Sequence, residues 1–269
     1  MAEGAKHLVR IGAVVAAMIV LMSTPCKSQE SHIGNLTGLA KRGRPIYARY
    51  CVGCHGERGD GAGENAPHVN PQFPQPRDFT VGLFKCRSTP SGSIPLDSDL
   101  FDTVGRGINT TAMPSWFPLT RQERADLVAY IKTFSPRFRD EKPDPAVIIP
   151  PETALTPASL ERGKGLYEAN KCGECHGKDG RGDGPSAPSL RDNKGNPIPP
   201  YDFTTGERFK CGQTDSDLAR IFLTGLDGTP MPTYVDYLQG DQIWDLIHYL
   251  RTLQTNHKHK TLWARLFAD

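Results

Sequence analysis

The stretch CVGCH, residues 51–55, recurs as CGECH at residues 172–176. Each copy places two cysteines and a histidine within five residues. The flanking sequences are also alike, since RGRPIYARYCVGCHGERGDGAGENAP (42–67) resembles RGKGLYEANKCGECHGKDGRGDGPSAP (162–188). Two copies about 120 residues apart indicate a tandem pair of domains, because the repeats of a solenoid are much shorter.

The duplication extends well beyond the cysteine motifs. RDFTVGLFKCRST (77–89) resembles YDFTTGERFKCGQT (201–214), and DSDLFDTVGRGINTTAMPSW (97–116) resembles DSDLARIFLTGLDGTPMPTY (215–234). Each copy closes with apolar residues at three- and four-residue steps, which is typical of an amphipathic helix, and no run of alternating strands stands out. With 27 glycines and 23 prolines, the chain is predicted to be all-α, with two tandem helical domains and long Gly/Pro-rich loops.

The copies and the composition between them predict the division of the chain. The predicted segments are a signal peptide at 1–28, a first domain at 36–137, a linker at 138–158, a second domain at 159–254 and a C-terminal tail at 255–269. High proline content predicts that the linker is extended. The tail either docks on a partner or covers its own domain.

The N-terminus is typical of an export signal. Lys6 and Arg10 precede an uncharged, largely aliphatic run at 11–22, whose length fits a signal peptide and is short for a membrane-spanning helix. Cys26 and Ser28 have the small-x-small spacing of a cleavage site, so we predict cleavage after Ser28. Lipidation at Cys26 and an uncleaved membrane anchor are the alternatives. All three predict a periplasmic or otherwise extracytoplasmic protein.

Charge is divided unevenly along the chain. Residues 29–140 hold 14 basic and 11 acidic residues, a net charge of +3, whereas residues 141–269 hold 15 and 18, a net charge of −3. This difference either steers two partners to the two ends of the molecule or is an uninformative feature of the surface. No basic block indicates nucleic-acid binding.

Three chemistries use a C-x-x-C-H motif. A structural zinc site needs four ligands, usually from a second C-x-x-C nearby, and each copy lacks one. A thioredoxin-like redox pair would need a βαβ setting, which the sequence does not indicate. Covalent haem attachment needs only what is present, because two thiols add to the porphyrin vinyl groups and the adjacent histidine binds iron. The motifs therefore predict two haem c groups, attached through Cys51, Cys54, Cys172 and Cys175.

The histidines of the two motifs, His55 and His176, are the predicted proximal iron ligands. Each needs an acceptor for its second ring nitrogen. Pro67 and Pro188 each lie twelve residues beyond their histidine, within a shared Ala-Pro pair. We predict that their carbonyl groups accept these hydrogen bonds, although a proline that only stiffens the loop is the alternative.

The second axial ligand should be duplicated as well. Met113 and Met231 lie in AMP and PMP, 58 and 55 residues after their histidines, and an aromatic residue follows three positions later in each copy. A methionine is usually a core filler, but the repeated setting predicts thioether ligation, which raises the reduction potential.

The remaining histidines near the motifs fit ligation less well. His68 competes as a ligand only in the first copy and has no counterpart in the second. His248 aligns with an alanine, so we expect it on a helix surface. His257 and His259 lie in the tail and are expected to be solvated.

With these motifs, the chain resembles a di-haem cytochrome c built from two class I cytochrome c domains, over residues 40–134 and 160–253. The resemblance implies that the helix before each motif crosses the last helix of its domain. The DFT…FK segment is similar to an insertion in bacterial di-haem cytochromes that serve respiratory oxidoreductase complexes. The second copy departs from that pattern at Gly212 and Gln213.

Two further cysteines, Cys86 and Cys211, occupy equivalent positions in FKC. Because exported proteins rarely keep exposed free thiols, three interpretations stay open: a disulfide between them, two separately buried thiols, or a thiolate ligand on one iron. Lys85 and Lys210 beside them either contact haem propionates or are solvated, as surface lysines usually are.

The predicted function is single-electron transfer by a periplasmic di-haem cytochrome with two His/Met-ligated irons, and not enzymatic catalysis. Its partners would be a redox donor and an acceptor, with the protein either a free carrier or the haem subunit of a membrane-associated oxidoreductase complex. The alternative is a di-haem enzyme, a peroxidase or a thiosulfate-oxidising cytochrome, with one open or Cys-ligated haem. Such an enzyme needs an accessible iron, which two matched Met-Pro loops argue against.

Overall fold

The structure of the protein is a computed structural model, which describes residues 30–70, 73–206 and 208–254. The first domain contains β1 (Glu30–Ile33), β2 (Leu36–Leu39), α1 (Ala40–Tyr50), α2 (Val52–His55), η2 (Ala66–His68), α3 (Asp97–Arg106), α4 (Arg121–Lys132) and α5 (Arg137–Asp140). The second contains α6 (Pro157–Ala169), α7 (Gly173–His176), η3 (Ala187–Ser189), η4 (Phe203–Thr205), α8 (Asp215–Thr224) and α9 (Gly240–Thr252). The predicted signal peptide and C-terminal tail lie outside the described residues. Among the described helices, none has the length and apolar character to cross a bilayer.

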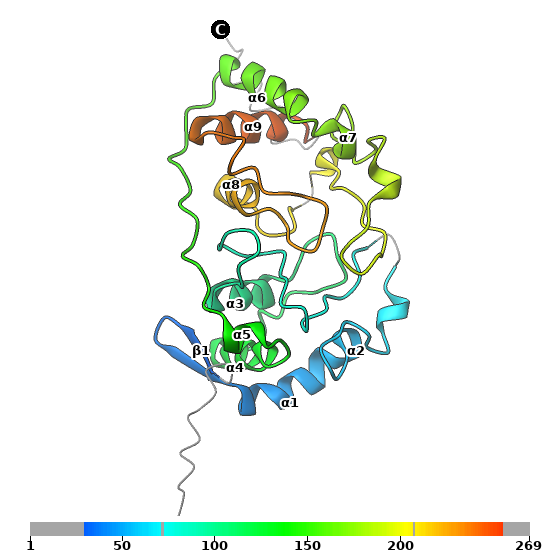
Figure 1. Ribbon diagram of the computed structural model, residues 1–269, viewed down its shortest axis with the longest axis vertical. Coiled ribbons are helices and arrows are strands. Elements are labelled where there is room, and N and C mark those ends of the chain that lie inside the picture. The colour runs from blue at the N-terminus through cyan, green and yellow to red at the C-terminus, as the bar shows by residue number, and fades with distance from the viewer. Residues whose placement is uncertain (1–29, 71–72, 207, 255–269) are drawn as a thin grey trace, which may run out of the picture.

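The two domains face each other, with the crossed helix pairs at opposite ends of the molecule (Figure 1). In the first domain α1 packs on α4, and in the second α6 packs on α9. A Cβ added to Gly43 or Gly163 would lie 2.0 Å from the carbonyl oxygen of Asp126 or Asp245. Glycine thus allows each pair of helix backbones to approach closely, and the helix crossing implied by the resemblance is confirmed.

Helices dominate as predicted, but a small antiparallel hairpin precedes α1. Strands β1 and β2 pair from Glu30 with Leu39 to Ile33 with Leu36. Gly34, in a left-handed conformation with φ 57°, opens the turn between them. The Ser31 hydroxyl donates to the carbonyl of Ala125 in α4 at 2.7 Å. Because each strand has only four residues, it carries too little alternation to be recognised in the sequence.

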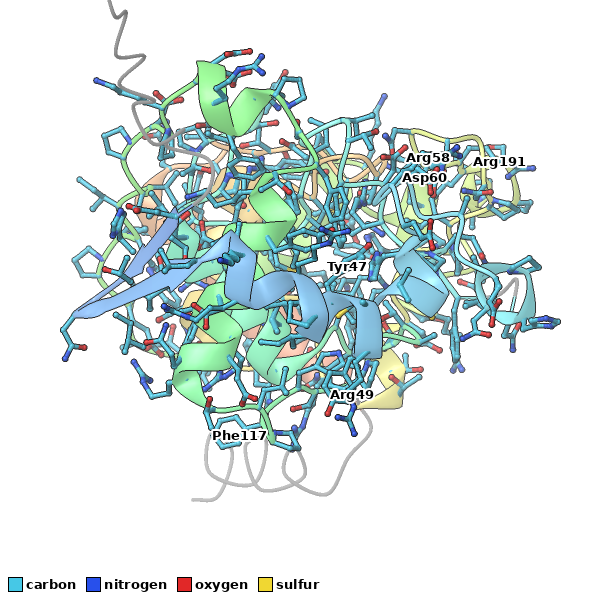
Figure 2. All side chains as sticks on the ribbon, turned by 90° about the horizontal axis from the view of Figure 1, so that it is seen from below. Tyr47, Arg49, Arg58, Asp60, Phe117 and Arg191 are labelled. Atoms are coloured by element: carbon cyan, nitrogen blue, oxygen red, sulfur yellow. A yellow bond between two sulfur atoms is a disulfide. The ribbon has the colours of Figure 1, made fainter. Side chains whose placement is uncertain are left out.

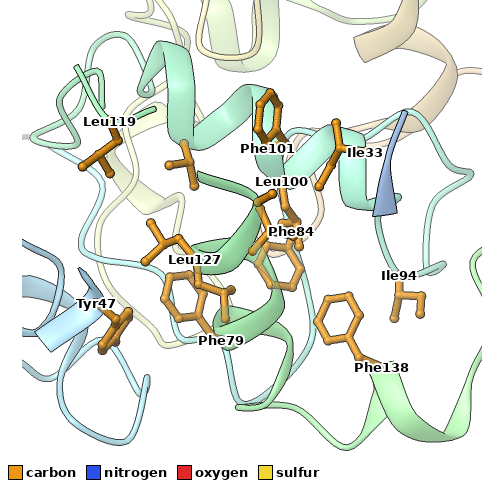
Figure 3. Packing of buried hydrophobic residues seen from close by; sticks show 14 residues of the cluster. Ile33, Tyr47, Phe79, Phe84, Ile94, Leu100, Phe101, Leu119, Leu127 and Phe138 are labelled. Atoms are coloured by element: carbon orange, nitrogen blue, oxygen red, sulfur yellow. The ribbon is translucent and has the colours of Figure 1, made fainter. Parts of the chain in front are cut away.

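Each domain has its own apolar core. In the first, Phe79, Phe84 and Phe138 lie among aliphatic residues of α3 and α4 (Figure 3). In the second, Trp244 and Ile247 of α9 are almost completely buried. Two separate cores explain why the duplicated sequence folds as two domains rather than as one.

The connector between the domains makes hydrogen bonds to both of them. It has no helix or strand over 141–156. The Val147 N–H donates to the carbonyl of Ser88 at 2.8 Å, and the Trp244 indole donates to the carbonyl of Pro150 at 3.1 Å. The connector therefore lies along both domains, as its path in Figure 1 shows.

A disulfide and a buried ion pair join the domains. Cys86 is bonded to Cys211, so the structure selects the disulfide among the three interpretations of these cysteines. Beside it, Arg87 donates to the carbonyl of Thr224 at 2.6 Å and pairs with Asp227 at 2.8 Å, with its side chain fully buried. The interface is thus held by a covalent bond and by the Arg87 guanidinium, whose partners Thr224 and Asp227 belong to the other domain.

Candidate functional site

Each cysteine motif forms a single helical turn, α2 or α7, directly after a longer helix. The Tyr47 hydroxyl donates to the carbonyl of Gly56 at 2.7 Å, and Tyr167 makes the same bond to Gly177 at 2.7 Å. Both glycines have positive φ, 78° and 80°, which lets the chain turn back over the motif. The tyrosine of the preceding helix therefore fixes the end of each motif.

The four motif cysteines are not joined as disulfides and are partly buried. Burial raises the pKa of Cys51 to about 12 and that of Cys172 to about 11. Thiols with such pKa values are protonated at neutral pH, whereas thiol–disulfide exchange needs a thiolate. This setting does not suit the redox-pair interpretation of the motif.

The two motif histidines have matching environments. The Nδ1 atom of His55 lies 3.1 Å from the carbonyl oxygen of Arg77, and that of His176 lies 3.0 Å from the carbonyl oxygen of Tyr201. Burial lowers the pKa of both imidazoles, which favours the neutral form. A neutral imidazole that donates from Nδ1 keeps the lone pair of Nε2 available for a metal ion.

The prediction that Pro67 and Pro188 accept these hydrogen bonds is wrong. The carbonyl group of Pro188 instead accepts from Arg191 at 2.9 Å. Pro67 lies in the short η2 turn. The carbonyl group that faces His55 Nδ1 belongs to Arg77, which lies ten residues further along the chain. Both Ala-Pro pairs thus begin 3-10 turns, and the acceptor comes from the duplicated segment that follows.

That segment also contributes one phenylalanine to the surroundings of each histidine, which the cysteine motifs alone do not indicate. Phe79 stacks on the His55 ring with centroids 4.4 Å apart, and Phe203 lies 4.8 Å from the ring of His176. Both belong to the repeated Asp-Phe-Thr, one residue after the Asp that follows the acceptor carbonyl. The recurrence of this tripeptide indicates a shared role, but the tripeptide is far from the motif in sequence, so its contact with the histidine cannot be predicted from spacing.

The two Met-Pro loops are also built alike. The Met113 N–H donates to the hydroxyl of Thr111 at 3.1 Å, and the Met231 N–H donates to Thr229 at 3.2 Å. Outside residues 1–28, Met113 and Met231 are the only methionines of the chain.

Each domain has one large pocket, which brings its motif and its methionine together. The first contains Cys51, Cys54, His55 and Met113, and the second contains Cys172, Cys175, His176 and Met231. The space between the atoms, including the open mouth, is about 1480 Å³ in the first pocket and 1130 Å³ in the second. Neither Pro67 nor Pro188 lines either of these two pockets.

Both pockets fit a haem group. Thiols and an imidazole stand on one wall, a thioether lies on the loop that completes the pocket, and most of the other lining side chains are apolar. Such walls would hold the porphyrin and exclude water, while the cysteines would anchor it. A haem bound there supplies one-electron chemistry at its iron.

The other histidines that the structure describes line neither of these two pockets. His68 is exposed and lines neither of them. His248 is buried, with 5% of its surface exposed, and its Nδ1 lies 3.3 Å from the Ser159 hydroxyl. The expectation of a surface position for His248 is wrong, because this side of α9 is covered by α6. His257 and His259 lie outside the described residues.

Comparisons with known proteins agree with this geometry. The family model described as "Cytochrome c" matches residues 160–254, and the one described as "Cytochrome C oxidase, cbb3-type, subunit III" matches residues 38–131. Among solved structures, a chain of the reducing HAO-like protein complex of Kuenenia stuttgartiensis is 42% identical, with a TM-score of 0.76. The alignment covers 80% of this chain and 96% of that one. No curated protein matches the sequence.

Two haem-binding domains in tandem define a di-haem cytochrome c. The chain belongs to the cytochrome c family, since both of its domains match models of cytochrome c proteins and a solved relative is 42% identical over 96% of that relative's length. It binds two haem c groups covalently, and these haems serve electron transfer.

Proposed function

We propose that this protein is a periplasmic electron carrier, and not an enzyme, in which His55 and Met113 ligate one iron and His176 and Met231 ligate the other. The observation that carries this proposal is the duplicated pocket, which gathers one motif histidine and one loop methionine in each domain. A thioether ligand favours the reduced iron and closes the coordination site to small molecules. A protein with two closed haems transfers electrons without binding a substrate at iron.

Carbon monoxide binding to the reduced protein tests this ligation. We expect no rapid binding at either haem, followed in the visible spectrum. Stoichiometric binding at one haem would contradict the carrier, and peroxide and thiosulfate would then be tested as substrates.

We assign the Gly- and Pro-rich segment after each motif to the mouth of the haem pocket. This is supported by Pro74 and Pro76, which line the first pocket, and by Pro199 and Pro200, which line the second. Prolines there would keep the mouth rigid without needing backbone N–H partners.

We further propose that residues 1–28 are a signal peptide and that a linker separates the two domains. Because α5 ends at Asp140 and α6 begins at Pro157, we shorten the linker predicted at 138–158 to residues 141–156, and β1 and α5 extend the first domain beyond the predicted 36–137. The charged start and the aliphatic run of the first segment support export. The mass of the protein purified from its native cell tests the cleavage. A mature chain that begins at Gln29 is expected, and one that begins at Met1 or at a lipid-modified Cys26 would contradict it.

We also propose that the protein works as the haem subunit of a complex with an HAO-like protein. This is supported by the solved relative, which is a chain of a reducing HAO-like protein complex. A docking face is available at the first pocket. Phe117, on the loop after Met113, is 74% exposed, and Figure 2 shows it at the edge of the molecule. Tyr50, which lines the pocket, is 39% exposed.

Co-purification from the native cell, with the partner identified by mass spectrometry, tests the complex. Recovery of an HAO-like protein is expected, and Phe117→Ser should reduce it several-fold because an exposed aromatic anchor is lost. Ile148→Ser is the matched control, since Ile148 is 90% exposed but lies on the connector. Equal loss in both variants, or no HAO-like protein with the unaltered chain, would contradict the proposal.

A further inference from the structure

Three cationic side chains gather where the two haem pockets approach each other. Arg77 and Lys85 line the first pocket, and Lys210 lines the second. Lys85 is only 9% exposed. Since Lys85 and Lys210 each precede a cysteine of the interdomain disulfide, that bond keeps the two lysines close together. They are not the solvated surface lysines that their residue type would suggest.

These cations also cross the boundary between the domains. The Lys210 ammonium, from the second domain, donates to the Thr110 hydroxyl of the first domain at 3.0 Å. The Arg77 guanidinium, from the first domain, donates to the side-chain carbonyl of Asn193 in the second at 3.1 Å. At Gly228 a Cβ would come within 2.3 Å of Arg77 Nη1, so the second domain leaves room for this side chain.

No carboxylate forms an ion pair with these three cations among the residues that the structure describes. Asp192 has the largest acidic influence on Arg77, and it accepts from the N–H groups of Lys194 and Asn196, each at 2.9 Å. Asp227, whose influence is smaller, is paired with Arg87 at 2.8 Å. Asp78 accepts from the N–H and hydroxyl of Thr80 at 2.9 and 2.6 Å.

Burial, together with the charges of Arg77 and Lys210, lowers the pKa of Lys85 to about 7. Buried charges are normally compensated, and each haem brings two propionate carboxylates.

We propose that Arg77, Lys85 and Lys210 form one cationic seam that holds propionates of both haems, so that each lysine raises the reduction potential of the haem in the other domain as well as its own. Positive charge in a low-dielectric interior favours ferrous over ferric iron. Because the seam lies between the pockets, its charge acts on both haems at once. Lys85 and Lys210 are therefore positioning residues that tie the two potentials together.

The test uses the full di-haem protein, with both midpoint potentials measured by spectroelectrochemical titration. In Lys85→Met and in Lys210→Met we expect both potentials to fall. The larger shift should be at least a tenfold change in the one-electron equilibrium, which is about 59 mV. The charge-retaining Lys85→Arg and Lys210→Arg should keep both potentials near those of the unaltered protein. Lys85→Gln and Lys210→Gln repeat the test with a smaller change of polarity.

Lys194→Met is the matched control. Lys194 also reaches across the interface, donating to the carbonyl of Asp60 at 2.7 Å, but it is partly exposed, lies 3.8 Å from the Asp78 carboxylate and lines neither pocket. A shift confined to one haem, or shifts no larger than those of the control, would overturn the seam.

The inference rests on the proposed function only in that both pockets hold haem. A haem content of two per chain, measured by pyridine haemochrome, is required of every variant. Carbon monoxide binding by the unaltered protein would contradict the His/Met ligation alone, whereas unmoved potentials in fully loaded variants would contradict the seam alone.

Discussion

Cys86 and Cys211 hold the same position in the two sequence copies and are bonded to each other, with their Cα atoms 5.1 Å apart. A bond between equivalent residues means that the two domains present the same segment to each other. The disulfide closes a loop of 125 residues, which contains the connector and the second cysteine motif. It therefore holds the two haem pockets in one relative position and joins the two ends of the loop.

Removal of this disulfide should destabilise the protein. For Cys86→Ser/Cys211→Ser we expect the free energy of unfolding to fall by about 2–5 kcal/mol, because the unfolded chain is no longer constrained. Urea unfolding followed by circular dichroism measures the loss. The unaltered protein with a reductant should show a similar fall, and an unchanged midpoint in both samples would contradict the role of the disulfide.

Loss of a ligand methionine should open a coordination site on one iron and leave the other iron unchanged. For Met113→Ala we expect carbon monoxide to bind at one haem per chain, and one of the two potentials to fall because the thioether is lost. Titration of the visible spectrum counts the sites. Ile108→Ala, which alters the same pocket without removing a ligand, should bind none. Binding by neither variant would mean that Met113 is not an axial ligand.

Two glycines of α6 offer a matched pair. A Cβ at Gly163 would lie 2.0 Å from the carbonyl oxygen of Asp245, whereas one at Gly165 would meet nothing within 4 Å. Gly163→Ala should destabilise the second domain by about 1–3 kcal/mol, because the crossed helices must move apart. Gly165→Ala should stabilise it by about 0.4–1 kcal/mol, because the unfolded chain loses freedom. The midpoint of thermal unfolding is measured for both variants. Equal changes in stability for the two variants would be inconsistent with a close crossing of α6 and α9.

Stability should depend on pH through His248. Burial lowers the pKa of His248, against the opposing charges of Asp215, Asp245 and Glu152. The imidazole of the unfolded chain therefore binds a proton more readily than that of the folded chain. The contribution of His248 to the free energy of unfolding is fully present above the unfolded pKa of about 6.5. It falls as the pH drops below that value, by at most about 1.4 kcal/mol per pH unit. His248→Gln should lose less stability between pH 7.5 and 5.

The control for this prediction is His32→Gln. His32 has 66% of its side chain exposed, so its replacement removes an imidazole without opening the buried contact between α6 and α9. If His248→Gln and the unaltered protein lose the same stability between pH 7.5 and 5, His248 does not contribute to the pH dependence.

Much of the site was open to prediction because it is local and duplicated. Cys51, Cys54 and His55 are adjacent in sequence, so one helical turn suffices to bring them together. Met113 and Met231 were singled out by their shared setting, and the structure brings each into the pocket of its histidine. The partner of the histidine Nδ1 was missed, because a carbonyl acceptor carries no side-chain signal and any residue of the following loop can supply it.

The sequence by itself determined that there are two domains and two haem motifs, since covalent attachment needs only residues that are neighbours along the chain. The tertiary structure alone decided that Arg77 and Tyr201 support the histidines, that Cys86 meets Cys211, and that Lys85 and Lys210 share one buried seam. These relations join residues 22 to 125 positions apart. Such pairs are fixed by how the domains pack and by which charges become buried, and neither can be inferred from local spacing.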